Sequence, residues 1–266
     1  MFRSEIVKAA RYAPALAILI VFATWYNGAI FISGRDAAAY GYPFLVSVQR
    51  WNDTTASWIH TGSGILVNGK RVITAAHICA AFREYNDIIR CSMGRHNLDE
   101  EEQSAVHINI SSYHCHDEYN RMACEHDICL WNLAEEISKF TPWMMPAPFS
   151  FAHSPPFPEA CRLPGWGSSL GHNGTPSPIL QEGQIFPLTP FECKTLDPGI
   201  FEFNWCAYGQ EFPGPGDSGS PLICRSVPVV QGSSGCNTFV RDVTVSREKA
   251  LFLIPEPGPL PAFHYY

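Results

Sequence analysis

The hydrophobic positions of this chain fall in short runs rather than in long helical stripes. From about Tyr42 onward, apolar and β-branched residues cluster in segments that Gly, Pro and Asn interrupt. Short β-branched runs between turn residues are typical of strands. The pattern therefore predicts an all-β domain, a barrel or a sandwich. The clearest runs are Phe44–Val48, Gly64–Val67, Val72–Ala75, Val106–Ile110 and Leu222–Cys224.

Three segments depart from this pattern. Pro142–Pro158 is rich in proline and is predicted to be an extended crossing between two β lobes. Val245–Ile254 is predicted to form a closing helix that ends before Pro255 and Pro257. The tail at 255–266 is rich in proline and is predicted to be extended or loose.

The N-terminus has the pattern of a targeting segment. Arg3, Lys8 and Arg11 precede the apolar run Ala13–Trp25. A basic region followed by a short apolar region is typical of a signal peptide. The alternative is a membrane anchor, but the run is shorter than the roughly 20 residues that a span requires. Residues 1–29 are therefore predicted to be a signal peptide and short pro-segment, without a stable membrane span.

Composition narrows the class of protein. The 266 residues are 46% hydrophobic, enough for one large two-lobed domain. The formal net charge of −7 excludes a nucleic-acid partner, because an acidic surface repels phosphates. Ten cysteines indicate an oxidising compartment, and three glycosylation sequons agree with secretion to the extracellular space. The sequons place glycans on Asn52, Asn109 and Asn173.

Candidate chemistry lies in three segments. Ser218 stands between Asp217 and Gly219 in a loop with little side-chain bulk, where backbone N–H groups can hold an oxyanion. His77 ends the apolar run that starts at Val72, and Asp127 opens another apolar run. Such residues form a charge-oriented nucleophile in which serine attacks, histidine takes its proton and aspartate fixes the imidazole tautomer.

The order His77, Asp127, Ser218 and its spacing resemble those of the trypsin/chymotrypsin-like serine proteases, over roughly Ile32 to Ile254. The resemblance implies two six-stranded antiparallel β-barrels with a short C-terminal helix. It implies a protease domain over 30–254, with lobes at about 44–140 and 159–244. It also implies that the backbone N–H groups of Gly216 and Ser218 form the oxyanion hole. The loop before Ser218 resembles that of flatworm larval elastases, which favours a divergent, invertebrate-type member.

The resemblance also implies activation by cleavage of a zymogen. Ile32 is similar to the first residue of a mature protease, whose new ammonium group pairs with the aspartate before the serine, here Asp217. Phe31 precedes Ile32, so the cut is expected to be chymotrypsin-like, or the new terminus is Ile30 instead.

Disulfide pairing follows from the same resemblance and leaves open positions. Two bridges of the family are expected, and two further bridges are suggested by position along the chain. Cys129 and Cys236 receive no partner, and Cys129 is expected to be a buried thiol. The four expected bridges are Cys161–Cys224, Cys193–Cys206, Cys79–Cys91 and Cys115–Cys124.

Specificity is predicted from the residues around the pocket. In the family that the chain resembles, the floor of the specificity pocket lies about six residues before the serine, which implies Phe212 here. The resemblance therefore implies a chymotrypsin- or elastase-like preference, because no aspartate stands at that position. Glu211 leaves a basic side chain as an alternative. Pro215 and the segment Ser233, Ser234 and Gly235 are expected to contact substrate.

No cofactor and no metal is expected. Gly94–Leu98 with Glu100–Gln103 resembles a calcium loop, but Arg95 opposes a cation, so a solvated acidic loop is predicted. A zinc alternative rests on His114, Cys115, His116, Cys124 and His126.

The predicted function is a secreted, monomeric serine endopeptidase acting on proteins or peptides and open to protein inhibitors. The alternative is a catalytically silent homologue that binds or regulates.

Overall fold

The structure is a computed structural model of the 266-residue chain. The predictions for residues 1–33, the helix at 245–254 and the tail lie outside the residues it describes. Within the described part, no helix is long and apolar enough to cross a membrane. The described residues are 34–85, 88–123, 125–148, 159–168, 175–196, 198–200, 204–209, 213–224, 227–232 and 241–244.

Strands dominate the described residues, as the short apolar runs predict. The N-terminal half contains β1 (Arg35–Asp36), β2 (Leu45–Asn52), β3 (Ser57–Asn68), β4 (Arg71–Thr74), β5 (Ile89–Met93), β6 (Val106–Cys115) and β7 (Cys129–Leu133), with the helix α2 (Ala76–Tyr85). The C-terminal half contains β8 (Cys161–Gly165), β9 (Gln181–Pro187), β10 (Asn204–Gly209), β11 (Pro221–Cys224), β12 (Val227–Gly232) and β13 (Arg241–Thr244), with the helix α3 (Pro190–Leu196).

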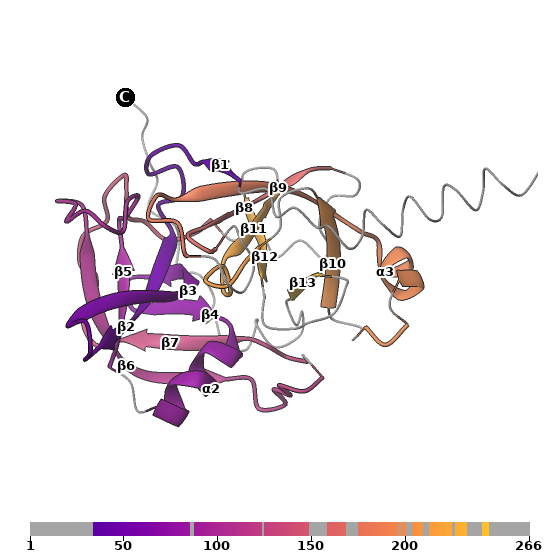
Figure 1. Cartoon of the computed structure of the whole chain (residues 1–266), viewed down its shortest axis with the longest axis horizontal. Coiled ribbons are helices and arrows are strands. Elements are labelled where there is room, and N and C mark those ends of the chain that lie inside the picture. Colours follow the sequence, from indigo (N-terminus) through magenta and orange to yellow (C-terminus); the bar gives the residue numbers. More distant parts are fainter. Residues whose placement is uncertain are drawn as a thin grey trace, which may run out of the picture. The chain divides into compact units, whose positions relative to one another are not determined.

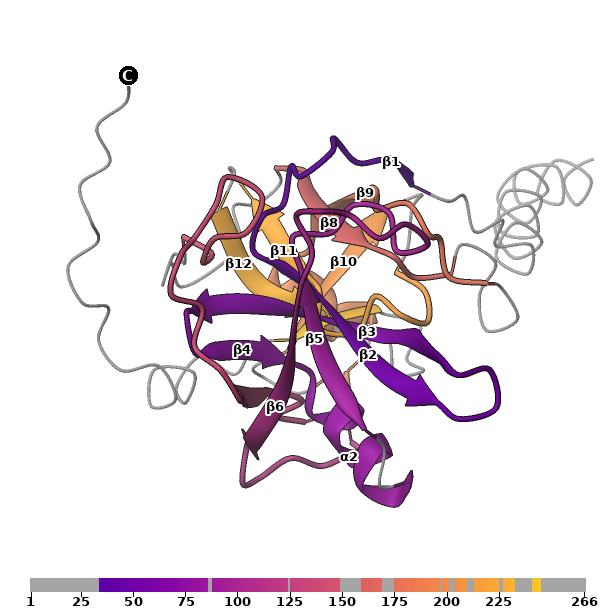
Figure 2. The ribbon, with the colours of Figure 1, turned by 90° about the vertical axis from the view of Figure 1, so that its left-hand side faces the viewer.

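Strands β2 to β7 close into a first antiparallel barrel in the order β2-β3-β4-β7-β6-β5. Figures 1 and 2 show these indigo and magenta strands gathered together, with α2 at one end of the barrel. Alternate residues of each strand point inward, so the interior is filled by apolar side chains such as Val48, Leu66, Met93 and Trp131, all fully buried.

The remaining strands form a second antiparallel sheet in the order β1-β9-β10-β13-β12-β11-β8. A further pairing of β8 with β9 closes six of them into a ring, with β1 paired to the outside of β9. Its core contains Leu163, Ile185 and Leu222. The prediction of an all-β, two-barrel fold is therefore confirmed.

A small apolar cluster joins the two barrels. Phe44 and Ile65 from the first barrel pack with Ile223 from β11 and with Ala147. Ala147 belongs to the predicted crossing segment, where its N–H donates to Leu66 O at 2.9 Å. The described part of that segment, up to residue 148, thus runs across both lobes as expected.

The two helices were not predicted. His77 was expected at the end of a strand, but β4 ends at Thr74 and His77 lies in the first turn of α2. In α3, Glu192 Oε2 accepts the Thr189 N–H at 2.8 Å, and Thr189 Oγ1 accepts the Glu192 N–H at 3.3 Å. This reciprocal capping box explains where α3 starts.

Two predicted disulfides, Cys161–Cys224 and Cys193–Cys206, are present. The prediction of Cys115–Cys124 is wrong, because Cys115 is bonded to Cys129, its direct cross-strand partner between β6 and β7. The prediction of Cys79–Cys91 is also wrong, since both residues carry thiols. The expectation that Cys129 is a buried thiol is wrong as well, because Cys129 forms the disulfide with Cys115. Cys124 and Cys236 lie outside the described residues.

Candidate active site

One carboxylate organises the start of α2. Asp127 Oδ2 accepts the hydrogen bond from His77 Nδ1 at 2.7 Å, and Asp127 Oδ1 accepts the His77 backbone N–H at 2.8 Å. The first N–H groups of a helix have no partner within the helix, so Asp127 satisfies one of them. The same side chain therefore starts the helix and orients the imidazole that the helix carries.

The segment before β7 places that carboxylate. Asp127 is buried at 3% exposure and follows His126, which has a left-handed backbone with φ of 54°. The His116 N–H donates to Ile128 O at 3.0 Å, and Cys115 is bonded to Cys129. These contacts tie both ends of the loop together immediately around Asp127.

The loop that carries Ser218 is pressed against the first barrel. Ser63 N–H donates to Ser218 O at 2.7 Å, and Ser218 is buried at 5% exposure. Gly219 has φ of 89°, and a Cβ there would lie 1.9 Å from Ser63 O. Only glycine therefore permits this approach of the two backbones.

Strand β3 brings this loop to the residues around His77. A Cβ on Gly62 would lie 2.5 Å from Ile78 Cδ1 and 3.3 Å from Ser218 O. Gly62 is thus flanked by the residue after His77 and by the carbonyl of Ser218. The structure brings all three predicted catalytic segments to this edge of β3.

The two peptide planes predicted to form the oxyanion hole are anchored through their carbonyl oxygens. Ser168 N–H donates to Pro215 O at 2.8 Å, and Ser220 N–H donates to Asp217 O at 2.9 Å. In a trans peptide the N–H points opposite to the carbonyl of the same plane. The N–H groups of Gly216 and Ser218 therefore point away from these internal bonds.

A buried polar chain that the sequence analysis missed holds the same loop. His60 Nε2 lies 2.9 Å from Gly216 O, and His60 Nδ1 lies 2.8 Å from Ser47 Oγ. Burial lowers the pKa of His60 to about 4, so the ring is neutral near pH 7. Because a carbonyl only accepts, Nε2 carries the hydrogen and Nδ1 accepts from Ser47. The available signal was a histidine inside the polar stretch His60-Thr-Gly-Ser63 of an apolar strand.

Asp217 fastens the serine loop to the end of β8. Its Oδ1 accepts the Gly167 N–H and its Oδ2 accepts the Gly214 N–H, both at 2.8 Å. Burial raises the pKa of Asp217 to about 6, against the opposing effect of these two hydrogen bonds. A Cβ on Gly165 would lie 1.8 Å from Asp217 Oδ1. The two glycines around Trp166 therefore leave the room that the carboxylate occupies.

Gly167→Ala is expected to damage both the fold and the site. Its Cβ would lie 2.2 Å from Asp217 Oδ2, so the serine loop must move. We expect a loss of about 3 kcal/mol in the free energy of unfolding, the upper range for overpacking, measured by urea denaturation. Gly41→Ala is the control, because its Cβ would meet nothing closer than 3.1 Å. Equal losses in the two variants would contradict this account.

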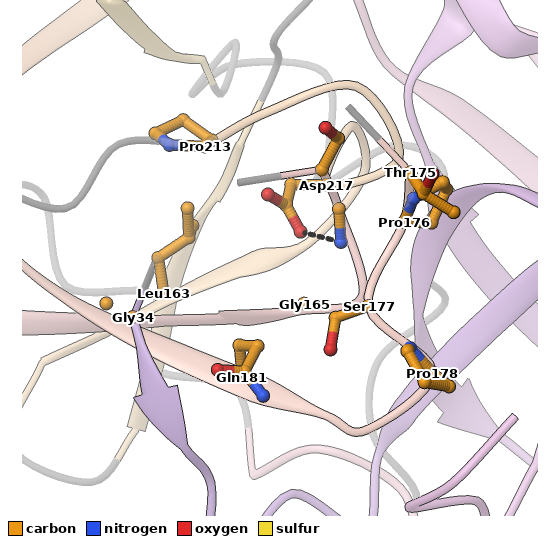
Figure 3. A pocket seen from close by; sticks show the side chains of 13 residues that line it. Gly34, Leu163, Gly165, Thr175, Pro176, Ser177, Pro178, Gln181, Pro213 and Asp217 are labelled. Carbon is orange, nitrogen blue, oxygen red and sulfur yellow. Dashed lines mark hydrogen bonds between the residues drawn. The ribbon is translucent and has the colours of Figure 1, made fainter. Parts of the chain in front are cut away.

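Asp217 also lines a pocket of about 420 Å³. Figure 3 shows its carboxylate between Pro213 and Leu163 on one side and the segment 175–178 on the other. Gly34, the first described residue, also lines this pocket. The next residue, Arg35, holds β1 in place through Glu182, with Nε to Oε1 at 2.7 Å.

The predicted acidic loop is organised around a buried cation. Arg95 is 6% exposed, and its Nη2 donates to the carbonyls of Asn97, Leu98 and Glu100 at 2.9, 3.0 and 2.5 Å. Its Nε donates to Glu102 Oε2 at 3.1 Å. The predicted solvated loop therefore has a buried guanidinium group at its centre. The carbonyl oxygens that this group binds are of the kind that a calcium ion would need as ligands.

In the described part of the chain, two residues of the zinc alternative, His116 and His126, lie close together beside Glu118. The ligand atoms of His116, Glu118 and His126 lie within 4.8 Å of one another. However, the two imidazole rings are stacked at 4.1 Å and 5°. Their lone pairs lie in parallel planes and do not meet at one ion. Cys115 is in a disulfide, and Cys124 lies outside the described residues.

Several predicted site residues fall outside the described part of the chain, and these are Ile32, Asn173, Glu211, Phe212, Ser233, Ser234 and Gly235. Pro215 lies in the serine loop, where its carbonyl fixes the following peptide plane. Of the described sequon residues, Asn52 lies at the end of β2 and Asn109 is exposed on β6.

Comparisons with known proteins agree with this geometry. The trypsin family model matches residues 31–246. Chymotrypsin-C of Mus musculus is 30% identical over 237 residues, covering 82% of this chain and 85% of the relative. Chymotrypsin-C of Rattus norvegicus is 29% identical, with the same coverage, and trypsin of Xenopus laevis is 26% identical over 83% of this chain and 87% of the relative. With this match and the two-barrel fold, the chain belongs to the trypsin-like serine protease family.

Proposed function

We propose that this protein is a serine endopeptidase that uses Ser218, His77 and Asp127. The observation that carries the proposal is the Asp127 carboxylate, which bonds both the backbone N–H and the Nδ1 of His77. An ionised carboxylate only accepts hydrogen bonds, so Nδ1 must carry the proton. The lone pair of His77 is then on Nε2, where a general base needs it.

In the proposed reaction, His77 Nε2 takes the hydroxyl proton of Ser218 as its oxygen attacks the peptide carbonyl. The negative charge that develops on the carbonyl oxygen is held by the N–H groups of Gly216 and Ser218. The protonated His77, stabilised by Asp127, then gives its proton to the leaving amine. Water hydrolyses the resulting acyl-enzyme by the same steps, with His77 again acting first as base.

The proposed substrates are proteins or peptides, cleaved with a chymotrypsin- or elastase-like preference. Support for this preference comes from the sequence, because no aspartate stands at the expected pocket floor. Three of the relatives are named chymotrypsin-C, and another is a chymase from Canis lupus familiaris at 24% identity. Secretion, glycosylation and a zymogen form are parts of the same proposal, supported by the N-terminus, the sequons and the disulfides.

Activation is proposed to join Ile32 to Asp217. Gly34 lies only two residues after Ile32 and lines the same pocket as the Asp217 carboxylate. Two extended residues span about 7 Å, so a terminus freed at Ile32 has the reach to enter this pocket. Its ammonium group would supply a positive charge to a carboxyl whose pKa burial raises.

This proposal predicts that stability depends on pH between pH 4 and pH 6 before cleavage but not after it. In the uncut chain, burial raises the pKa of Asp217 from its ordinary value of 3.8 to about 6, so the folded state binds more protons between these pH values. Stability should therefore fall by roughly 1–3 kcal/mol from pH 4 to pH 6 through this group. After cleavage, the ammonium group should lower the pKa and abolish that fall.

The measurement is the thermal midpoint of cut and uncut protein across pH 4–7, compared with Asp217→Asn in each form. Subtracting the variant removes the contribution of other titrating groups, such as His60. Identical differences in the cut and uncut forms would argue against pairing of the new terminus with Asp217.

The decisive test of the function is reaction with a serine-directed fluorophosphonate. The purified chain is cleaved next to Ile32, its new terminus is sequenced, and the modified peptide is located by mass. We expect one adduct, on Ser218, together with cleavage of a peptide library. A cleaved and folded protein that takes up no label would support the silent homologue instead.

A further inference from the structure

Three sulfur atoms meet beside the first turn of α2. The disulfide Cys115–Cys129 joins the last residue of β6 to the first residue of β7. Cys79 Sγ lies 2.9 Å from Cys129 Sγ, and its S–H points to that sulfur. Cys129 therefore has one sulfur neighbour bonded to it and a second in direct contact.

The Cys79–Cys129 contact repeats the connection made by the catalytic pair. Cys79 lies two residues after His77, and Cys129 lies two residues after Asp127. Both contacts therefore have the same sequence separation of 50 residues and join the same two segments, the start of α2 and the start of β7. A covalent bond at the sulfur contact would tie together the segments that hold His77 and Asp127.

We propose that Cys79 can displace Cys115 from its disulfide with Cys129, so that the first barrel has two alternative disulfides, Cys115–Cys129 and Cys79–Cys129. The Cys79 thiolate attacks Cys129 Sγ, a Cys79–Cys129 bond forms, and the Cys115–Cys129 bond breaks with its electron pair on Cys115 Sγ. The proton lost by Cys79 ends on Cys115. One disulfide and one thiol are present before and after, so no oxidant is required.

The surroundings of Cys79 favour it as the attacking group. Trp131 Nε1–H donates to Cys79 Sγ at 2.7 Å, and a hydrogen bond to the sulfur stabilises its charged form. Cys79 also lines a groove of about 510 Å³ that includes Asn109 and Ile88, which is 61% exposed. Cys79 is itself buried, at 3% exposure.

Cys91 is a poorer candidate for the same step. It is fully buried on β5, and burial raises the pKa of its thiol to about 12. A thiol with such a pKa is almost entirely protonated near neutral pH, and the thiol form is not the nucleophile. The geometry distinguishes Cys79 from Cys91, because Cys79 makes the sulfur contact with Cys129.

Exchange would change which part of the chain is constrained. The Cys115–Cys129 bond closes the loop that carries His116 and His126 toward Asp127, with a separation of 14 residues. The Cys79–Cys129 bond would close 50 residues and leave that loop open at its base. A bridge over a longer loop restricts the unfolded chain more, so the second form should resist thermal unfolding better.

The test maps disulfides in the full chain, in a Ser218→Ala background that prevents self-cleavage. Samples held at pH 6 and at pH 8.5 are quenched in acid, alkylated, digested without reductant and analysed by mass. We expect two populations, one with Cys115–Cys129 and alkylated Cys79, the other with Cys79–Cys129 and alkylated Cys115. The approach to their final ratio should be faster at pH 8.5, because more thiolate is present.

Matched variants separate exchange from misfolding. In Cys115→Ser, Cys129 should be bonded entirely to Cys79, and neither Cys79 nor Cys129 should be alkylated. Cys79→Ser should leave Cys115–Cys129 alone, and Cys91→Ser should leave both populations. Recovery of Cys115–Cys129 alone at both pH values, or of a Cys79–Cys91 or Cys115–Cys124 bond, would overturn the proposal. The mapping needs no enzyme activity, so its outcome is independent of the proposed function.

Discussion

Ser218→Ala is expected to lower kcat for peptide hydrolysis by about 10⁶-fold, as loss of the nucleophile does in a comparable triad. The change removes only the hydroxyl oxygen, whereas the loop is held by backbone bonds, among them Ser63 N–H to Ser218 O at 2.7 Å. The fold and the thermal midpoint should therefore persist while activity is lost. The measurement is kcat for cleaved protein on a peptide substrate, with the folded fraction checked by circular dichroism.

Ser220→Ala is the matched control for this variant. Ser220 is fully buried two residues away in the same loop, and in the described part of the structure its Oγ has no hydrogen-bond partner. Removing that hydroxyl should leave kcat near the parent value and should not lower stability. If Ser218→Ala retained activity within about tenfold of the Ser220→Ala protein, Ser218 would not be the nucleophile.

Asp127→Asn is expected to lower kcat by about 10⁴-fold. The two hydrogen bonds of His77 go to different oxygens of Asp127, and asparagine replaces one of these oxygens by an NH₂ group that cannot accept. If its NH₂ group faces Nδ1, the ring takes the other tautomer and Nε2 carries a hydrogen that blocks proton transfer. Loss of the helix-start contact should also lower the free energy of unfolding by about 1 kcal/mol.

The measurement is kcat against pH, together with urea denaturation. Activity in the variant should recover partly at high pH, where hydroxide can remove the serine proton without the imidazole. Asp117→Asn serves as the control, because Asp117 is an exposed carboxylate in the same loop. A similar loss of activity in Asp117→Asn would indicate a general effect of charge rather than a role for Asp127.

The all-β fold followed from the chain because strand patterns are local. Runs such as Val72–Ala75 are short, apolar and rich in β-branched residues, so they indicate strands without any knowledge of distant partners. Helix α2 was not predicted, because the carboxylate that bonds to its first turn belongs to Asp127, 50 residues away from His77. Helix α3 had a local signal in Thr189 and Glu192, which the sequence analysis did not use.

The candidate site was likewise predicted where the signal was local and missed where it was not. His77, Asp127 and Ser218 were found because each stands in a distinctive short motif. His60 was missed because its partner, Gly216 O, is 156 residues distant and is a backbone atom that no motif reveals. The disulfides of the first barrel were predicted from proximity in sequence, but Cys115 and Cys129 pair because β6 and β7 are adjacent strands.

Ser63 N–H to Ser218 O is a backbone bond between the two lobes, with the base and its carboxylate on one side and the nucleophile on the other. Neither barrel alone contains a complete set of reacting groups. The proposed hydrolysis therefore requires both barrels, and a chain in which each barrel is folded but the two have parted should be inactive. During synthesis, the proposed chemistry would therefore start only after the second lobe has docked on the first.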